Sequence, residues 1–140
     1  MTATSELVHT ARARTTGGRD HGISRSSDGR LDVRLATPGS DRIGTDPEHL
    51  FAAAWSASLG TAIEIAARRT KIALPAGVVI DAEVDLNIAR DGDFLSARFN
   101  VRLPGVEREA AEGLIDEARR TCPYAKATHG SVNIAITLLE

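Results

Sequence analysis

The sequence has one cysteine, Cys122, among its 140 residues. A single thiol excludes an internal disulfide framework and a zinc site made of several cysteines. Basic and acidic residues number 17 and 19 and are mixed along the chain, so no surplus of either charge favours nucleic acid or an anionic membrane as a partner. No apolar stretch reaches the ~20 residues of a membrane span, and the N-terminus lacks a signal-peptide pattern. We therefore expect a cytoplasmic protein.

The histidines also lack a pattern that would suggest a site. His9, His21, His49 and His129 do not have the spacing of metal ligands, and we expect neither a metal nor a cofactor. The length fits a single domain, residues 1–140, that is large enough to bury a hydrophobic core.

The longest uncharged stretch, residues 50–63, predicts a central helix. Thr45 or Asp46 can cap its N-terminus, and Pro47 suits a first-turn position that needs no N–H partner. Glu48 lies where a carboxylate meets the positive end of the helix dipole. Because the stretch is apolar on every side, we expect protein to cover it completely. Its large residues are expected in the core, or in part along an apolar pocket: Leu50, Phe51, Trp55 and Leu59.

In the rest of the chain, apolar residues recur either with the two-residue period of a strand or with the spacing of a helix. Apolar residues recur at every second position, which is typical of strands, over residues 8–15, 31–35, 80–88, 95–103 and 132–138. Asp28-Gly29 and Asp91-Gly92 predict hairpin turns. Helical spacing over residues 111–122 predicts a second helix that ends with Cys122 on its inward face, since Pro123 follows. The order of elements predicts an α+β fold, in which a mostly antiparallel sheet packs on two central helices.

Three short blocks carry the strongest functional signal. They are Gly17-Gly18-Arg19, the segment 46–53 that opens the central helix, and the segment 122–128 that begins Cys-Pro-Tyr. Together, and in this order, they resemble the organic hydroperoxide resistance (Ohr) branch of the OsmC superfamily over almost the whole chain. The resemblance implies an intertwined homodimer with two active sites near the subunit interface. It also implies reduction of fatty-acid and other organic hydroperoxides to alcohols in oxidative stress defence, with a lipoyl-type dithiol as the reductant.

The resemblance also assigns residues of the catalytic site. Arg19 matches the family's arginine, Glu48 its glutamate, and Cys122 its resolving cysteine. From these matches we expect Arg19 to hold a thiolate or peroxide oxygen and Glu48 to orient Arg19 through a bidentate pair. The alternative is a solvated bend residue and an ordinary first-turn carboxylate. The fourth position departs from the family, because Ser58 stands where the peroxidatic cysteine is expected.

This departure bears directly on the chemistry. A peroxidatic thiolate attacks the distal peroxide oxygen and becomes a sulfenic acid, which a second thiol converts to a disulfide. The hydroxyl of Ser58 has no sulfenic-type oxidation state, and its pKa lies far above that of a thiol. We therefore expect the chain as written to lack two-cysteine peroxidase turnover, although its pocket can still bind a peroxide.

Several interpretations stay open at this point. Ser58 is a deliberate replacement of the nucleophile, or the chain is a natural noncatalytic relative that binds or senses hydrophobic peroxides or lipids. A third possibility is a one-cysteine peroxidase in which Cys122 reacts alone, activated by Arg19. Cys122 is otherwise a small buried core thiol. A hydrolase with Ser58 as nucleophile and His49 or His129 as base is disfavoured, because the sequence lacks a G-x-S-x-G elbow.

Overall fold

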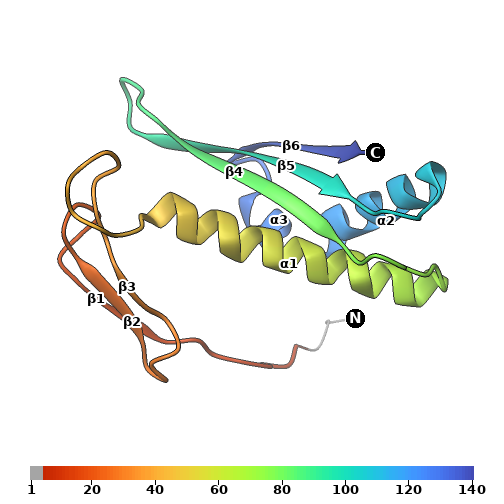
Figure 1. The fold of residues 1–140 in the computed structure, drawn as a ribbon, viewed down its shortest axis with the longest axis horizontal. Coiled ribbons are helices and arrows are strands. Elements are labelled where there is room, and N and C mark those ends of the chain that lie inside the picture. The colour runs from red at the N-terminus through yellow and green to blue at the C-terminus, as the bar shows by residue number, and fades with distance from the viewer. Residues whose placement is uncertain (1–4) are drawn as a thin grey trace. The chain divides into compact units, whose positions relative to one another are not determined.

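The computed structural model describes residues 5–140, and its elements fall into two compact units, Met1–Pro47 and Glu48–Glu140 (Figure 1). The strands of the first unit are β1 (Ala13–Thr16), β2 (Ile23–Ser26) and β3 (Asp32–Arg34). The second unit contains, in chain order, α1 (Pro47–Thr70), which starts at the boundary, β4 (Val79–Asn87), β5 (Phe94–Arg102), α2 (Arg108–Thr121), α3 (Pro123–Thr128) and β6 (Asn133–Leu139). Whether residues 1–140 form one domain stays a prediction.

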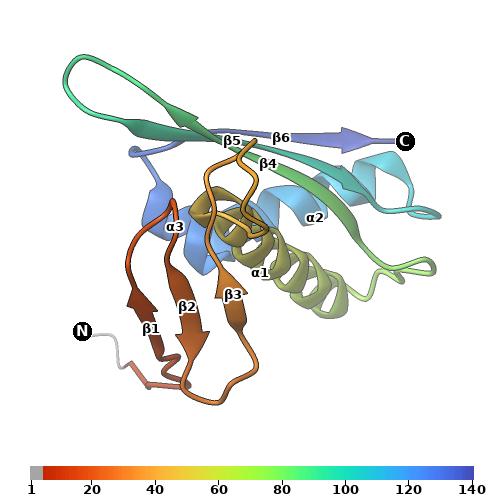
Figure 2. The same cartoon turned by 60° about the vertical axis from the view of Figure 1, so that its left-hand side comes forward.

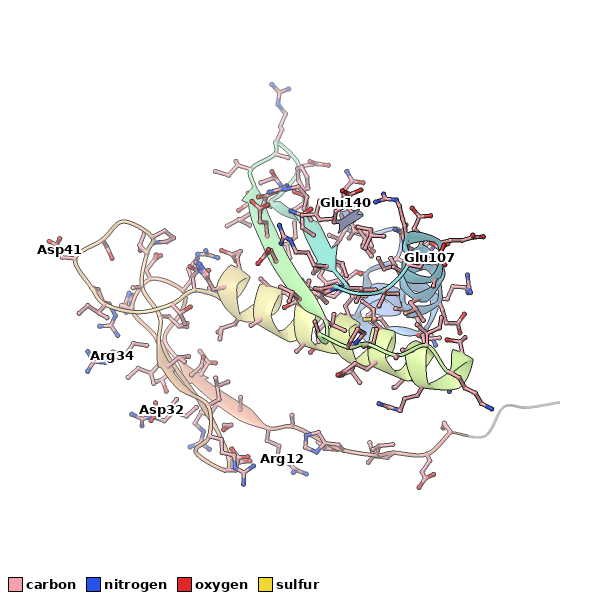
Figure 3. The ribbon with its side chains drawn as sticks, turned by 45° about the vertical axis from the view of Figure 1, so that its right-hand side comes forward. Arg12, Asp32, Arg34, Asp41, Glu107 and Glu140 are labelled. Atoms are coloured by element: carbon pink, nitrogen blue, oxygen red, sulfur yellow. The ribbon has the colours of Figure 1, made fainter. Side chains whose placement is uncertain are left out.

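The first unit is a small antiparallel sheet in the order β1-β2-β3. Asp28 forms the turn between β2 and β3, because its Oδ1 accepts hydrogen bonds from the Ser26 hydroxyl at 2.6 Å and from the Arg30 N–H at 3.0 Å. Figure 3 shows Asp32 and Arg34 on one side of β3, as the two-residue period of a strand requires. The sequence pattern placed a strand over residues 8–15, whereas β1 begins at Ala13. It also missed β2, whose four residues include one large apolar side chain.

The second unit combines a three-stranded sheet with three helices. The strand order is β4-β5-β6, with β4 antiparallel and β6 parallel to β5. A parallel neighbour requires a crossover, and α2 and α3 supply it between β5 and β6. Figures 1 and 2 both show α1 and α2 on the same face of this sheet. The predicted α+β class is confirmed, with two sheets and with α3 as an additional short helix.

The core lies between the sheet and α1. Trp55 on α1 packs edge-on against Phe99 on β5, with ring centroids 4.8 Å apart. Leu59 and Ile63 continue the buried stripe toward the C-terminus of α1. The opposite side of the helix, which includes Ala57, is exposed in this chain, so the expectation that protein covers α1 on every side is wrong for a single copy.

By length and composition alone, α1 would be able to cross a membrane, and it is the one helix of residues 5–140 for which this is true. A third of its apolar window, 33%, is buried inside the protein. The buried third forms the interface with the sheet, which is the packing of a core helix in a globular unit.

The outer face of the β4–β5 pair carries charged side chains that neutralise one another. Arg98 donates two hydrogen bonds to Asp85, at 2.6 and 3.0 Å, and Arg102 donates one to Asp81 at 2.9 Å. The bonds from Arg98 and then from Ser96 lower the pKa of Asp85 from 3.8 to about 2. The cross-strand pairs predicted for this hairpin are therefore confirmed.

Candidate active site

Ser58 and Cys122 meet where α1 passes the junction of α2 and α3. The Ser58 Oγ lies 3.5 Å from the Cys122 Sγ, although 64 positions separate the two residues in the chain. Phe51, Trp55 and Ser58 stand at positions i, i+4 and i+7 of α1. Their side chains therefore share one face of the helix. The structure thus brings together Ser58 and Cys122, the two positions at which the resemblance places reactive cysteines.

Local backbone geometry places Cys122 at this point. Its φ of −64° and ψ of 122° are extended, which ends α2 and starts α3 at the following proline. The Cys122 N–H donates to the Ala118 carbonyl at 2.8 Å, and the Cys122 carbonyl accepts from the Lys126 N–H at 3.0 Å. The side chain is 0% exposed. The prediction that Cys122 terminates a helix on its inward face is confirmed, and Pro123 at the first position of α3 is the signal that announces the new helix.

An aromatic cluster is built from residues close in sequence to the pair, on α1 and α3. The rings of Phe51 and Trp55 stack at a centroid distance of 5.3 Å, and the Phe51 ring also meets that of Tyr124 at 6.2 Å. Trp55 is buried, whereas Tyr124 is 37% exposed and lies at the edge of the cluster. The expectation that Phe51 and Trp55 belong to the core or line an apolar pocket agrees with this arrangement, because Trp55 is part of the buried core and Phe51 packs against it.

Glu48 lies in the first turn of α1, where the helix dipole favours a carboxylate, and is half-buried. It precedes Ser58 by ten residues, which corresponds to roughly 15 Å along a helix axis. Its carboxylate therefore reaches the surroundings of Ser58 only through another side chain. This geometry is compatible with the expected role of Glu48 as a partner that orients an arginine.

Arg19 lies in the first unit, on the turn between β1 and β2, as the glycine pair before it predicts. The turn is tight, since the Gly22 N–H donates to the Gly18 carbonyl at 2.7 Å and a Cβ on Gly22 would lie 2.5 Å from that oxygen. Arg19 and Glu48 both take part in interactions within the structure. Their pairing with each other, and the approach of Arg19 to Ser58, stay predictions.

The structure gives no support to a serine hydrolase. The Ser58 hydroxyl is hydrogen-bonded to the thiol of Cys122. His49 stands nine residues before Ser58, about 13 Å along the helix axis. No group of three histidine, cysteine, aspartate or glutamate side chains in the described part of the chain is arranged to hold a metal ion.

A separate hollow of about 400 Å³ lies along the exposed side of α1. Ser56 contributes to its wall, but its hydroxyl donates to the Ala52 carbonyl at 2.7 Å. Its remaining lining residues are mostly small or apolar: Ala53, Ala57, Gly60, Thr61, Glu64, Val78 and Ile80.

The arrangement of Ser58 and Cys122 defines what the site can do. A disulfide has an S–S bond of about 2.05 Å, so a sulfur in place of the Ser58 oxygen would have to move by roughly 1.5 Å to bond to Cys122. Side-chain rotation and a small backbone shift supply a movement of this size. With the oxygen present, the pair forms a weak hydrogen bond and has no disulfide chemistry.

Comparison with known proteins finds relatives that are similar in sequence and in fold. The family model of OsmC-like proteins matches residues 37–137. The organic hydroperoxide resistance protein of Xanthomonas axonopodis pv. citri is 35% identical over 142 residues, which cover 99% of both chains. The crystal structure of the organic hydroperoxide resistance protein OhrB of Bacillus subtilis has a TM-score of 0.87 at 33% identity and covers 94% of this chain and 98% of its own. That of an organic hydroperoxide resistance protein OsmC from Legionella pneumophila has a TM-score of 0.88 at 32% identity, covering 96% and 100%.

Proposed function

Because the chain belongs to the OsmC-like protein family, we propose that it has the structure of a thiol-dependent peroxidase that reduces organic hydroperoxides, with position 58 as the place of the reacting sulfur. One observation supports this proposal above all. The Ser58 Oγ lies 3.5 Å from the Sγ of the fully buried Cys122, so a second sulfur at this point would be within reach of a disulfide. As written, the chain lacks the nucleophile and is inactive as a two-cysteine peroxidase.

The proposed reaction has three balanced steps. A thiolate at position 58 attacks the distal oxygen of the hydroperoxide; the S–O bond forms, the O–O bond breaks, and the alkoxide takes a proton and leaves as the alcohol. The thiol of Cys122 attacks the sulfenic sulfur, and water leaves as the disulfide forms. An external dithiol, for which a lipoyl-type compound is the proposed physiological form, then reduces the disulfide and is itself oxidised.

The charged residues have proposed roles in the first step. A guanidinium at Arg19 would stabilise the thiolate and hold the peroxide oxygen, because a charge-assisted hydrogen bond favours the anion. Glu48 would orient that guanidinium, since its position on α1 is too distant for direct contact with residue 58. The aromatic cluster of Phe51, Trp55 and Tyr124 would screen the reacting atoms from water.

We also propose that a second copy of the chain covers the exposed side of α1. The hollow beside α1 has walls of small and apolar residues, and a helix surface of this kind normally packs against protein. Light scattering coupled to size exclusion would give twice the chain mass of 14.9 kDa for such a homodimer. A cytoplasmic location remains part of the proposal, as does the absence of a membrane or nucleic acid partner.

A noncatalytic role is the second candidate, and the hydrogen bond between Ser58 and Cys122 favours it. Because the hydroxyl already has a partner inside the site, the pair is stable without any redox chemistry. The protein would then bind or sense hydrophobic peroxides or lipids. In that case the unmodified chain binds apolar ligands, and a cysteine introduced at position 58 stays unreactive toward peroxide.

The variant Ser58→Cys tests the main proposal. With dihydrolipoate or dithiothreitol it should consume tert-butyl and cumene hydroperoxide, and mass spectrometry should find a disulfide between position 58 and Cys122. Ser56→Cys is the matched control, because Ser56 lies on the same helix but its hydroxyl bonds to Ala52. If Ser58→Cys neither consumes peroxide nor forms the disulfide, the proposed peroxidase function is refuted.

A further inference from the structure

The segment that carries Cys122 makes two side-chain contacts with α1, one of them through the sulfur. The first is the contact between Cys122 and Ser58, at 3.5 Å. The second is the contact between the rings of Tyr124 and Phe51, whose centroids are 6.2 Å apart. Figures 1 and 2 both show α3, which begins directly after Cys122, beside the N-terminal half of α1.

The two contacts are separated both along α1 and along the segment. Phe51 and Ser58 lie on one stripe of α1, seven residues apart, which is about 10 Å along the helix axis. Cys122 and Tyr124 are separated by one residue, Pro123, whose ring restricts the backbone between them. The two contacts lie along the same stripe of α1, and they act together with the packing of Cys122 and Ala125 in the core.

The second contact is supported by the core. Phe51 stacks on Trp55 at 5.3 Å, and Trp55 packs against Phe99 of the sheet at 4.8 Å. Tyr124 is therefore connected to the core by successive ring contacts, the last of which involves the fully buried Phe99. The backbone bonds on either side of Cys122 hold the ends of α2 and α3, but neither of them reaches α1.

The hydroxyl of Tyr124 takes no part in this contact. Among residues 5–140, no hydrogen bond to the phenol oxygen is formed, and the side chain is 37% exposed. The ring alone makes the contact with Phe51. Tyr124→Phe therefore keeps the interaction, and Tyr124→Ala removes it at a position where truncation leaves no sealed cavity.

We propose that Tyr124 is a positioning residue, which through its ring contact with Phe51 keeps the sulfur of Cys122 at position 58 and so sets the effective concentration of the resolving thiol. This inference rests on the proposed function, because it assigns a role in the step that forms the disulfide. Tyr124 itself does not touch the reacting atoms.

The test measures the disulfide equilibrium of Ser58→Cys, without any peroxide. The protein is equilibrated in glutathione or dithiothreitol redox buffers, and the oxidised fraction is read by mass spectrometry after alkylation. An aromatic pair of this kind contributes a free energy equivalent to about a 2- to 10-fold change in an equilibrium constant. Tyr124→Ala should therefore lower the oxidation constant by that factor, which makes the reduction potential about 10–30 mV less negative. Tyr124→Phe should retain the parent value.

Two further variants separate positioning from general damage. Phe94→Ala removes a ring that is 48% exposed and lies at the start of β5, and it should leave the reduction potential unchanged. Phe51→Leu should shift the potential as Tyr124→Ala does, and the double variant should add little to either, because both break the same contact. Additive shifts, or equal shifts from Phe94→Ala, would overturn the proposal.

The experiments distinguish failure of this proposal from failure of the peroxidase proposal. If Ser58→Cys forms the disulfide but does not consume hydroperoxide, while Tyr124→Ala lowers the oxidation constant, the proposed function fails and the positioning role stands. If Ser58→Cys is an active peroxidase and Tyr124→Ala leaves both the oxidation constant and the rate of disulfide formation unchanged, the positioning role fails and the proposed function stands. Thermal unfolding of each variant, followed by circular dichroism, confirms that the compared proteins are folded.

Discussion

A disulfide between position 58 and Cys122 would tie α1 to the junction of α2 and α3, and its effect on stability can be calculated from the structure. In the variant Ser58→Cys, oxidation closes a covalent loop between residues that are 64 positions apart. Both ends lie in the unit Glu48–Glu140, so the loop encloses most of α1, β4, β5 and α2. The folded chain already holds the two side chains 3.5 Å apart, and oxidation therefore restricts mainly the unfolded chain.

The expected size of the effect follows from the loop length. In the chain-entropy model, a loop of about 64 residues stabilises the folded state by about 4 kcal/mol at 25 °C. The required approach of the two sulfurs by roughly 1.5 Å introduces strain, which reduces this value. For a domain of this size, 1 kcal/mol corresponds to about 3–4 °C in Tm, so oxidised Ser58→Cys should unfold about 10–15 °C above its reduced form.

The assay compares one protein in two redox states. Ser58→Cys is oxidised with one equivalent of hydroperoxide or with diamide, freed of reagent, and unfolded by heat and by urea with and without a reductant. Ser56→Cys treated in the same way should show no difference between the two states. If the disulfide is confirmed by mass spectrometry and Tm does not rise, the side chains at positions 58 and 122 are not arranged as the structure shows, and the reasoning is refuted.

Three other predictions concern the fold that supports the site. Phe99→Ala should lower the free energy of unfolding by about 3–5 kcal/mol, measured by urea titration, because it deletes a ring that is 0% exposed and opens a cavity beneath Trp55. Gly105→Ala should lower the free energy of unfolding by at least about 1–2 kcal/mol, since Gly105 has a φ of +81° and a Cβ there would lie 2.6 Å from a proline ring. Gly113→Ala should be neutral or stabilising, because Gly113 lies in α2 with open space where a Cβ would stand. The hydrogen bonds from Arg98 lower the pKa of Asp85 from 3.8 to about 2, so its contribution to stability is complete above pH 3.8 and is lost as the pH falls toward 2. Asp85→Asn should therefore make unfolding by acid less steep in that interval. An unchanged profile would contradict the assignment.

The hairpin of β4 and β5 was predictable to within one residue at each end, because residues 80–87 and 95–102 alternate strictly and Asp91-Gly92 marks the turn between the strands. The strands β1 and β2 were less predictable. They contain four residues each, and most of these are polar or small, so no apolar period distinguishes them from a loop. The six residues of α3 are too few to show a helical period, and Pro123 alone indicates their start.

The candidate site shows a different limit. The helical spacing of residues 111–122 and the apolar run of α1 placed Cys122 and Ser58 on helices, but no periodic pattern gives the distance between them. That distance depends on how α1 and the α2–α3 junction pack on the sheet, which is a property of the whole unit. The resemblance to a known family suggested that the two positions act together, and the structure places their side chains 3.5 Å apart. The exposed side of α1 was mispredicted for the same reason, because an apolar stripe does not reveal whether the same chain covers it.

Serine differs from cysteine by one atom at the end of the side chain. For this reason, the residue at position 58 can determine the reactivity of the site without changing the fold. The oxygen fits where a sulfur fits and forms a hydrogen bond to Cys122, so packing around the site does not depend on which atom is present. Chemical reactivity, in contrast, depends on it completely, because an alcohol has neither the low pKa nor the oxidation states of a thiol. Relatives at 31–35% identity thus agree with the chain in fold over nearly its full length without deciding whether it turns over peroxide. Introducing a single sulfur at position 58 decides whether the surrounding site supports peroxide reduction.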